Sequence, residues 1–249
     1  MKGRGVGDGS AALSLDGQVA IITGASRGIG RAISVTFARA GASVVLAART
    51  ESDLTHVAQE IRKRRPDSQT MALRVDVADE RDVERMIEQA LERFGRVDIL
   101  VNNAGVWAFK SVQETSVAEW DRMMETNLRG VFLCAKAVLR PMIQQQSGQI
   151  INISSAAGKR GYGNMAAYCA SKFGVTGFTE ALAEEVQPHN IRVVAICPGA
   201  VANSRYEHDP RPADELKMLS TEDIAQLALY LAAAPSRVLI SEIVINPRV

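Results

Sequence analysis

The sequence contains few of the residues that mark metal-binding, disulfide-bonded or membrane proteins. Only three cysteines and three histidines occur in 249 residues, and neither set has the spacing of a metal site. No apolar run approaches the roughly 18 residues that a membrane span requires. The Gly-rich residues 1–14 lack the apolar core of a secretory signal. We therefore expect a soluble, cytoplasmic protein with a disordered extension over residues 1–14 and no metal.

The cysteines do not suggest disulfide chemistry. Cys134, Cys169 and Cys197 are odd in number, and each lies inside an apolar segment. Free cysteines in such segments are usually buried thiols. We interpret them in this way, the alternative being a redox or ligand role.

No excess of charge points to a polyanionic partner. The 29 basic and 28 acidic residues give a formal net charge of +1, which provides no electrostatic footprint for nucleic acid or for an anionic membrane. The length suits one large α/β domain, which we place over residues 15–249.

Short β-branched runs alternate with longer helical patterns along the chain. The predicted strands are Val19–Ile22, Ser43–Ala47, Thr70–Val75, Val97–Val101, Gln149–Ile153, Ile191–Ile196 and Ile240–Ile245. The predicted helices are Gly28–Ala40, Glu51–Arg64, Glu80–Phe94, Glu119–Gln146, Ala166–Val186 and Thr221–Ala233. This alternation predicts an α/β, doubly wound, Rossmann-like fold with a parallel sheet of about seven strands and helices on both faces. The long irregular stretch 200–220 is predicted to be a substrate lid.

A glycine-rich turn follows the first predicted strand. Residues 23–30 read Thr-Gly-Ala-Ser-Arg-Gly-Ile-Gly and lead directly into a helix. Glycines there let the backbone approach a pyrophosphate, which the amides of the helix N-terminus attract. The Lys-Ser/Thr pair of a nucleotide P-loop is absent. The alternative is simply a tight strand-to-helix connection.

The end of the second predicted strand indicates which nicotinamide cofactor is bound. NAD-binding Rossmann proteins place an acidic residue there, whereas NADP needs positive charge. Here the position is Ala48, Arg49 follows it, and Arg27 of the glycine turn points to the same region. Two guanidinium groups can bind a 2'-phosphate through charge-assisted hydrogen bonds, so we expect NADP(H). The alternative is two ordinary surface arginines.

Further blocks occur in order after the glycine turn: Asp76-Val77, Asn102-Asn103-Ala104-Gly105, Asn127, and Ser155 with Tyr168-x-x-x-Lys172. With the turn, they resemble the single-domain short-chain dehydrogenase/reductase family, and the 3-oxoacyl-thioester reductases are the closest-looking subfamily. The resemblance covers Leu15 to Gly199. The C-terminal part departs from it, because the chain ends in residues 243–249 where many members have a Val-Asp-Gly-Gly type ending.

The resemblance implies a catalytic set. Ser155 would bind the substrate oxygen, Tyr168 would transfer the proton, and Lys172 would tune the tyrosine and pass protons on. Asn127 would hold a relay water in a helix kink. Tyr168 and Lys172 are four residues apart in a helical pattern, so they share one face, where an ammonium lowers the pKa of a phenol. Taken alone, such a pair is most often an ordinary surface helix pair.

The resemblance also implies the cofactor contacts. Asp76 and Val77 would contact the adenine, Asn103 and Gly105 would border the cofactor, and Pro198-Gly199 would pass the nicotinamide. Asn203 stands where the family often has threonine. The expected cofactor-binding residues are Gly24, Ser26, Arg27, Gly28, Ile29, Gly30, Arg49, Asp76, Val77, Asn103, Ala104, Gly105, Tyr168, Lys172, Pro198, Gly199, Val201 and Asn203.

These observations favour an NADP(H)-dependent enzyme that interconverts a small-molecule carbonyl and a secondary alcohol. The alternative is a catalytically silent NADP-binding regulatory protein. A nucleotide-sugar epimerase would need a larger C-terminal domain than the about 50 residues that follow Pro198. Two predicted helices, Glu119–Gln146 and Ala166–Val186, resemble the family's association surface, so we expect a homotetramer, or else a homodimer. Possible pocket residues are Trp107, Tyr162, Met165, Tyr206 and Lys217.

Overall fold

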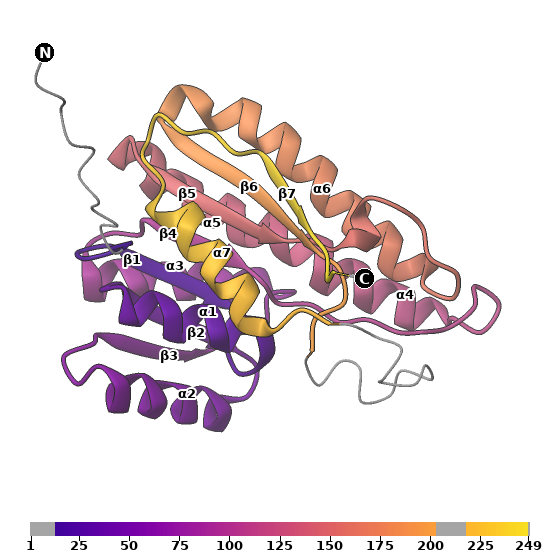
Figure 1. Cartoon of the computed structure of the whole chain (residues 1–249), viewed down its shortest axis with the longest axis horizontal. Coiled ribbons are helices and arrows are strands. Elements are labelled where there is room, and N and C mark those ends of the chain that lie inside the picture. The colour runs from indigo at the N-terminus through magenta and orange to yellow at the C-terminus, as the bar shows by residue number, and fades with distance from the viewer. Residues whose placement is uncertain (1–12, 203–217, 249) are drawn as a thin grey trace, which may run out of the picture.

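A seven-stranded parallel sheet forms the centre of the molecule (Figure 1). The computed structural model describes residues 13–202 and 218–248. The strand order is β3-β2-β1-β4-β5-β6-β7. The strands are β1 (Val19–Thr23), β2 (Ser43–Ala48), β3 (Thr70–Arg74), β4 (Ile99–Asn102), β5 (Gly148–Ile153), β6 (Ile191–Pro198) and β7 (Glu242–Ile245). This confirms the predicted doubly wound architecture.

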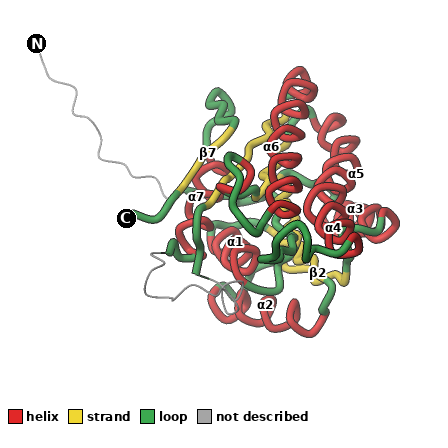
Figure 2. The backbone as a smooth tube through the Cα atoms, turned by 90° about the vertical axis from the view of Figure 1, so that its right-hand side faces the viewer, coloured by secondary structure: helices red, strands yellow, loops and turns green. Residues whose placement is uncertain are grey.

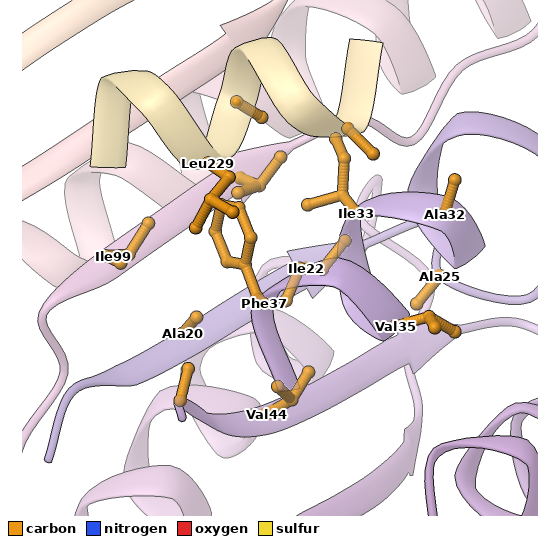
Figure 3. Close-up of a cluster of buried hydrophobic side chains, with 14 of the residues drawn as sticks. Ala20, Ile22, Ala25, Ala32, Ile33, Val35, Phe37, Val44, Ile99 and Leu229 are labelled. Atoms are coloured by element: carbon orange, nitrogen blue, oxygen red, sulfur yellow. The ribbon is translucent and has the colours of Figure 1, made fainter. Parts of the chain in front are cut away.

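Helices cover both faces of the sheet (Figure 2). One face carries α1 (Gly28–Arg39), α2 (Glu51–Arg64) and α7 (Thr221–Ala233), and the other carries α3 (Glu80–Phe94), α5 (Gly130–Gln145) and α6 (Ala166–Val186). Because both faces are covered, most strand residues are apolar and buried, as expected for a parallel sheet. In Figure 3, Phe37 and Ile33 of α1 lie between the sheet and Leu229 of α7.

The order of strands reverses between β1 and β4. From β1 the chain moves outward to β2 and β3, and then returns to place β4 on the other side of β1. At such a switch point the loops after the two strands diverge and leave a crevice at the carboxyl ends. The glycine turn follows β1, and the Asn103–Gly105 segment follows β4. Both expected cofactor segments therefore lie at this crevice.

The long helix predicted over residues 119–146 is wrong in detail. It begins at Val117, where Ser116 and Glu119 form a capping box. It is then divided into α4 (Val117–Met124), a π-helical turn (Glu125–Arg129) and α5.

Two strands begin later in the structure than the sequence predicts. Strand β4 begins at Ile99 and not at Val97, since the Val97 N–H donates to the Gln145 side chain, and β7 begins at Glu242 and not at Ile240.

Candidate active site

The turn after β1 and the segment after β4 are joined by hydrogen bonds. The Thr23 hydroxyl accepts the N–H groups of Asn103 and Ala104 at 3.0 and 3.1 Å. The Asn103 amide in turn donates to the carbonyls of Thr23 and Gly24 at 3.0 and 3.2 Å. These bonds fix the two walls of the crevice relative to each other, so Asn103 acts mainly as a structural link.

Glycine is required at two points of the turn. Gly24 has a φ of +64°, in the left-handed region that other residues rarely adopt. A Cβ on Gly30 would come 2.2 Å from the Gly24 carbonyl oxygen and 2.5 Å from the Asn103 amide nitrogen. The N-terminus of α1 is therefore packed directly against the turn, and Gly28 and Ile29 at its start line the crevice.

We predict that Gly30→Ala abolishes cofactor binding. The added methyl must push the backbone of Gly24 outward, because a carbonyl oxygen cannot give way as a flexible side chain would. Overpacking of this kind costs roughly 1–3 kcal/mol of stability or more. Isothermal titration with NADPH measures the effect, and Gly163→Ala, where an added Cβ meets nothing within 4 Å, is the control. Equal affinities of both variants and wild type would contradict the prediction.

A cleft of about 840 Å³ opens at the switch point. It extends from the glycine turn along the ends of β2 and β3, past residues 103–109, and on to α4. A dinucleotide needs an elongated site of this kind, and ligand sites commonly occupy 300–1,000 Å³. The expected cofactor residues that line it are Gly24, Ser26, Arg27, Gly28, Ile29, Arg49, Asp76, Val77, Asn103, Ala104 and Gly105.

One end of the cleft carries the two arginines. Arg27 and Arg49 are exposed and line it together with Ala48 and Thr50. Asp53, in the first turn of α2, also lines this end, but neither arginine is in an ion pair with it. The guanidinium groups are thus available to a ligand, which fits a 2'-phosphate.

The π-helical turn places Asn127 against the loop after β4. Its side chain is fully buried; Oδ1 accepts the Val106 N–H at 2.8 Å, and Nδ2 donates to the Val106 carbonyl at 2.8 Å and to the Ser171 hydroxyl at 3.0 Å. Ser171 donates to the Tyr168 carbonyl of α6 at 2.8 Å. Asn127 therefore connects α6 to the wall of the cleft, and π-turns of this kind often mark functional sites.

Tyr168 and Lys172 face the same region from the first turns of α6. Both are more than 95% buried. The Lys172 Nζ lies 5.9 Å from the centroid of the Tyr168 ring and donates to the Ile153 carbonyl at 2.8 Å. A Cβ placed on Gly105, which lines the cleft, would lie 3.9 Å from this Nζ. The tyrosine–lysine pair is therefore not a surface helix pair, although neither side chain lines the cleft itself.

The two adjacent serines at the end of β5 face different surroundings. The Ser154 hydroxyl is buried and contacts the Lys172 carbonyl and the Thr176 hydroxyl at 3.2 and 3.1 Å. The Ser155 hydroxyl accepts the Ala157 N–H at 3.1 Å, and the residue is only partly buried. Ser154 thus holds α6 against β5, while Ser155 retains a hydroxyl proton to donate.

The turn after β6 lies beside the C-terminal residues. Gly199 donates its N–H to the Ile245 carbonyl at 2.8 Å, and a Cβ there would meet the Asn246 side chain at 2.7 Å. Val201 is buried and pairs with Leu219. Asn203, Tyr206, Lys217 and nearly all of the predicted lid lie outside the described residues.

The cysteines are buried and free, as predicted. Burial raises the pKa of the Cys134 thiol to about 12 and also raises that of Cys197, so neither provides a thiolate near neutral pH. Within residues 13–202 and 218–248, no group of three potential ligands could hold a metal ion. No helix in this part of the chain is long and apolar enough to cross a membrane.

Comparison with known proteins identifies the family. The family profile described as short chain dehydrogenase matches residues 18–213, most of the chain. The chain belongs to the short-chain dehydrogenase/reductase family. Members are oxidoreductases that bind a nicotinamide cofactor and act on small molecules.

Relatives in this family match beyond Gly199, the last residue of the motif-based resemblance. An uncharacterized oxidoreductase of Staphylococcus saprophyticus is 36% identical over 94% of this chain and 99% of its own. A 3-oxoacyl-[acyl-carrier-protein] reductase of Synechocystis is 36% identical over 90% of this chain and 92% of its own length. A metagenomic short-chain oxidoreductase, whose crystal structure was solved in complex with NADP, has 36% sequence identity to this chain. The two structures superpose with a TM-score of 0.83, and the match covers 94% of this chain and 99% of that one. The 3-oxoacyl-reductase-like resemblance is thus confirmed.

Sequence reasoning missed one wall of the cleft in this short-chain dehydrogenase/reductase. The residues Glu119, Arg122, Met123 and Thr126 line it from α4 and the start of the π-turn. Their spacing of three, four and seven is that of one helix face, so this signal was present in the sequence. The hydroxyl of Thr23 and the main chain of Val106 carried no such signal.

Proposed function

We propose that this protein is an NADP(H)-dependent oxidoreductase that interconverts a carbonyl and a secondary alcohol. The observation that carries the proposal is the buried Tyr168–Lys172 pair, held between the β5 terminus and Gly105 at the cleft wall. Burying an ammonium is costly unless it is compensated, so a lysine here implies a use for its charge. Consumption of NADPH with a panel of carbonyl compounds tests the activity.

Four residues, Ser155, Tyr168, Lys172 and Asn127, have a role in carbonyl reduction. NADP(H), which the glycine turn, Arg27 and Arg49 would hold, would supply a hydride to the carbonyl carbon or accept one from the alcohol carbon. Ser155 donates a hydrogen bond to the carbonyl oxygen, and Tyr168 transfers its phenolic proton to the same oxygen as negative charge develops there. Lys172 stabilises the resulting phenolate, and Asn127 keeps α6 in place. The product is the alcohol, and oxidation follows the reverse path.

The second candidate is an NADP-binding regulatory protein without turnover. The glycine turn and the two arginines would serve such a protein equally well. Cofactor binding alone needs neither the partly exposed hydroxyl of Ser155 nor a phenol beside a buried lysine, so the combination of Ser155, Tyr168 and Lys172 favours the enzyme. Lack of NADPH consumption with every carbonyl tested, despite tight NADPH binding, would favour the regulator.

We predict that NADPH protects the protein against heat more than NADH does. The guanidinium groups of Arg27 and Arg49 would bind a 2'-phosphate, which NADH lacks. A ligand at about 100 times its Kd stabilises the folded state by roughly 2.7 kcal/mol. Thermal melts at equal cofactor concentrations measure the difference. Equal shifts for the two cofactors would contradict the NADP assignment.

Relatives give a first choice of substrate. The Synechocystis relative is a 3-oxoacyl thioester reductase by name, and a relative in Chlorobaculum tepidum, 35% identical over 238 residues, is a sepiapterin reductase. Fold and catalytic set are shared by enzymes for many carbonyls. We propose that the substrate panel begin with 3-oxoacyl thioesters.

We propose that the chain forms a homotetramer through α5 and α6. Phe132 of α5 and Phe173 of α6 are 45% and 46% exposed, and Phe132 packs edge-on against Phe178 at a ring distance of 6.2 Å. An apolar face of this kind suits a symmetric interface. We predict a particle of about four times 26.9 kDa by light scattering, and Phe173→Glu should lower the mass. A monomeric wild-type protein at micromolar concentration would contradict this prediction. A dimer would mean that the chain associates through a single interface.

A further inference from the structure

The segment that joins the two halves of the proposed catalytic set has an unusual composition. Residues 156–167, between Ser155 and Tyr168, contain Lys159 and Arg160 but no acidic residue. The segment contacts the loop after β4, since the Lys110 N–H binds the Asn164 carbonyl at 2.7 Å. In Figure 1 these two segments lie side by side near the start of α6 and α4. Together they form a rim beside Tyr168, which we call the substrate rim (residues 106–110 and 159–165).

Two of the three cations on the substrate rim are neutralised. The Lys110 ammonium is hydrogen-bonded to Glu119 at 2.5 Å, and the Lys159 ammonium to Glu242 at 2.9 Å. Arg160 forms no ion pair with any described residue. The net positive charge of the rim therefore resides on Arg160.

Arg160 is nevertheless held in place. Its Nε donates to the Tyr162 hydroxyl at 2.8 Å, and its guanidinium carbon lies 4.8 Å from the centroid of the Tyr162 ring. Tyr162 packs against the hydrophobic cluster that contains Tyr168, along with Trp107 and Met165. Tyr162 thus holds the arginine beside the cluster that contains Tyr168, and the two terminal nitrogens of Arg160 remain for a ligand.

We propose that Arg160 recognises an anionic group, a carboxylate or phosphate, on the carbonyl substrate. An arginine presents donors in a planar fork that matches both anions, and stacking on an aromatic ring fixes its direction before the ligand arrives. Trp107, Tyr162 and Met165 pack against the cluster that contains Tyr168 and provide an apolar surface beside it. A substrate with an apolar or short aliphatic body and a terminal anion fits these surroundings. The inference rests on the proposed function and extends it to a substrate class.

Matched pairs of substrates test this inference. The carboxylate arm compares 4-oxopentanoate and 5-oxohexanoate with their methyl esters. The phosphate arm compares 5-oxohexyl phosphate with 6-hydroxyhexan-2-one, from which it differs only by the phosphate. A hydrogen bond to a charged group contributes roughly 1.5–3 kcal/mol, so the anion should exceed its neutral partner in kcat/KM by roughly 10- to 100-fold in one arm. The arm in which this occurs identifies the anion.

Variants then assign the preference to Arg160. In Arg160→Gln the anion-over-neutral ratio should fall to about 1, and in Arg160→Lys part of it should return, because a point charge remains without the planar fork. Lys159→Gln removes the same charge one residue away and should keep the ratio. Turnover of the neutral partner shows that each variant is folded.

Two results would overturn the inference: no preference for the anion in either arm, or a preference that Arg160→Gln leaves intact. If no carbonyl of the wider substrate panel, neutral or charged, consumes NADPH, the proposed function fails as well. If neutral compounds are turned over and no anion is preferred, the proposed oxidoreductase activity is supported. Only the proposed role of Arg160 in substrate recognition is then wrong.

Discussion

Tyr168→Phe should lower kcat by roughly 10²- to 10⁴-fold, the usual contribution of a general acid–base group. The substitution removes the transferable proton and retains the ring, which is buried in the cluster with Met123, Ala157 and Cys169. Packing should therefore survive, and NADPH should bind to the variant with little change in affinity. Steady-state kinetics on the best substrate of the panel, together with titration of NADPH, measure the two effects.

Tyr162→Phe is the matched control for this experiment. It removes the hydroxyl of a tyrosine that packs against the same cluster, and this hydroxyl accepts a hydrogen bond from Arg160. It should lower kcat far less than Tyr168→Phe. Retention of most of the activity by Tyr168→Phe would show that another group transfers the proton.

The two reaction directions should also respond oppositely to pH. Reduction needs the protonated phenol of Tyr168, and its rate should fall as that proton is lost at high pH. Oxidation needs the phenolate, and its rate should rise over the same range. In Tyr168→Phe both trends should disappear, which separates proton transfer from a merely structural role.

The architecture was predictable because the chain's local patterns agree with its tertiary structure. Apolar runs such as Val44–Ala47 are buried on both faces, so they appear as unbroken β-branched segments and not as alternating ones. Helix α6 matches its predicted bounds, and α7 begins at a capping box formed by Ser220 and Asp223. At the π-turn, where sequence and structure differ, Asn127 makes a long-range contact with Val106.

The π-turn contains Asn127, where the family resemblance implies a helix kink, but the local pattern of the sequence does not predict it. Residues 119–146 carry continuous helical periodicity, and nothing local indicates where one extra residue enters a turn. The position depends on the hydrogen bonds between Asn127 and the main chain of Val106, 21 residues earlier. Similarly, the Thr23 hydroxyl meets Asn103 and Ala104 only because β1 and β4 are neighbours. Such contacts follow from topology and have no sequence motif of their own.

Cofactor preference should reverse from NADPH to NADH when the residues at the end of β2 are replaced. In Ala48→Asp/Arg49→Ala, the new carboxylate would lie where Ala48 lines the cleft, and a cation beside it is lost. An aspartate there can accept hydrogen bonds from a ribose 2'-hydroxyl but repels a 2'-phosphate. Since each charge-assisted hydrogen bond contributes roughly 1.5–3 kcal/mol, the NADPH-over-NADH ratio of kcat/KM should fall by roughly 100-fold or more.

The control for this switch is Arg64→Ala, which removes one positive charge from the C-terminal end of α2. Arg64 forms an ion pair with Glu60 at 3.0 Å and does not line the cleft. If the preference for NADPH arose from the general field of the protein, this variant would reduce it too, and added salt would weaken it in the wild type to a similar degree. If Arg49 and Arg27 contact the 2'-phosphate directly, Arg64→Ala should leave the ratio unchanged, and Arg27→Ala should lower it. An unaltered ratio in Ala48→Asp/Arg49→Ala would place the determinant of cofactor choice outside the β2 terminus.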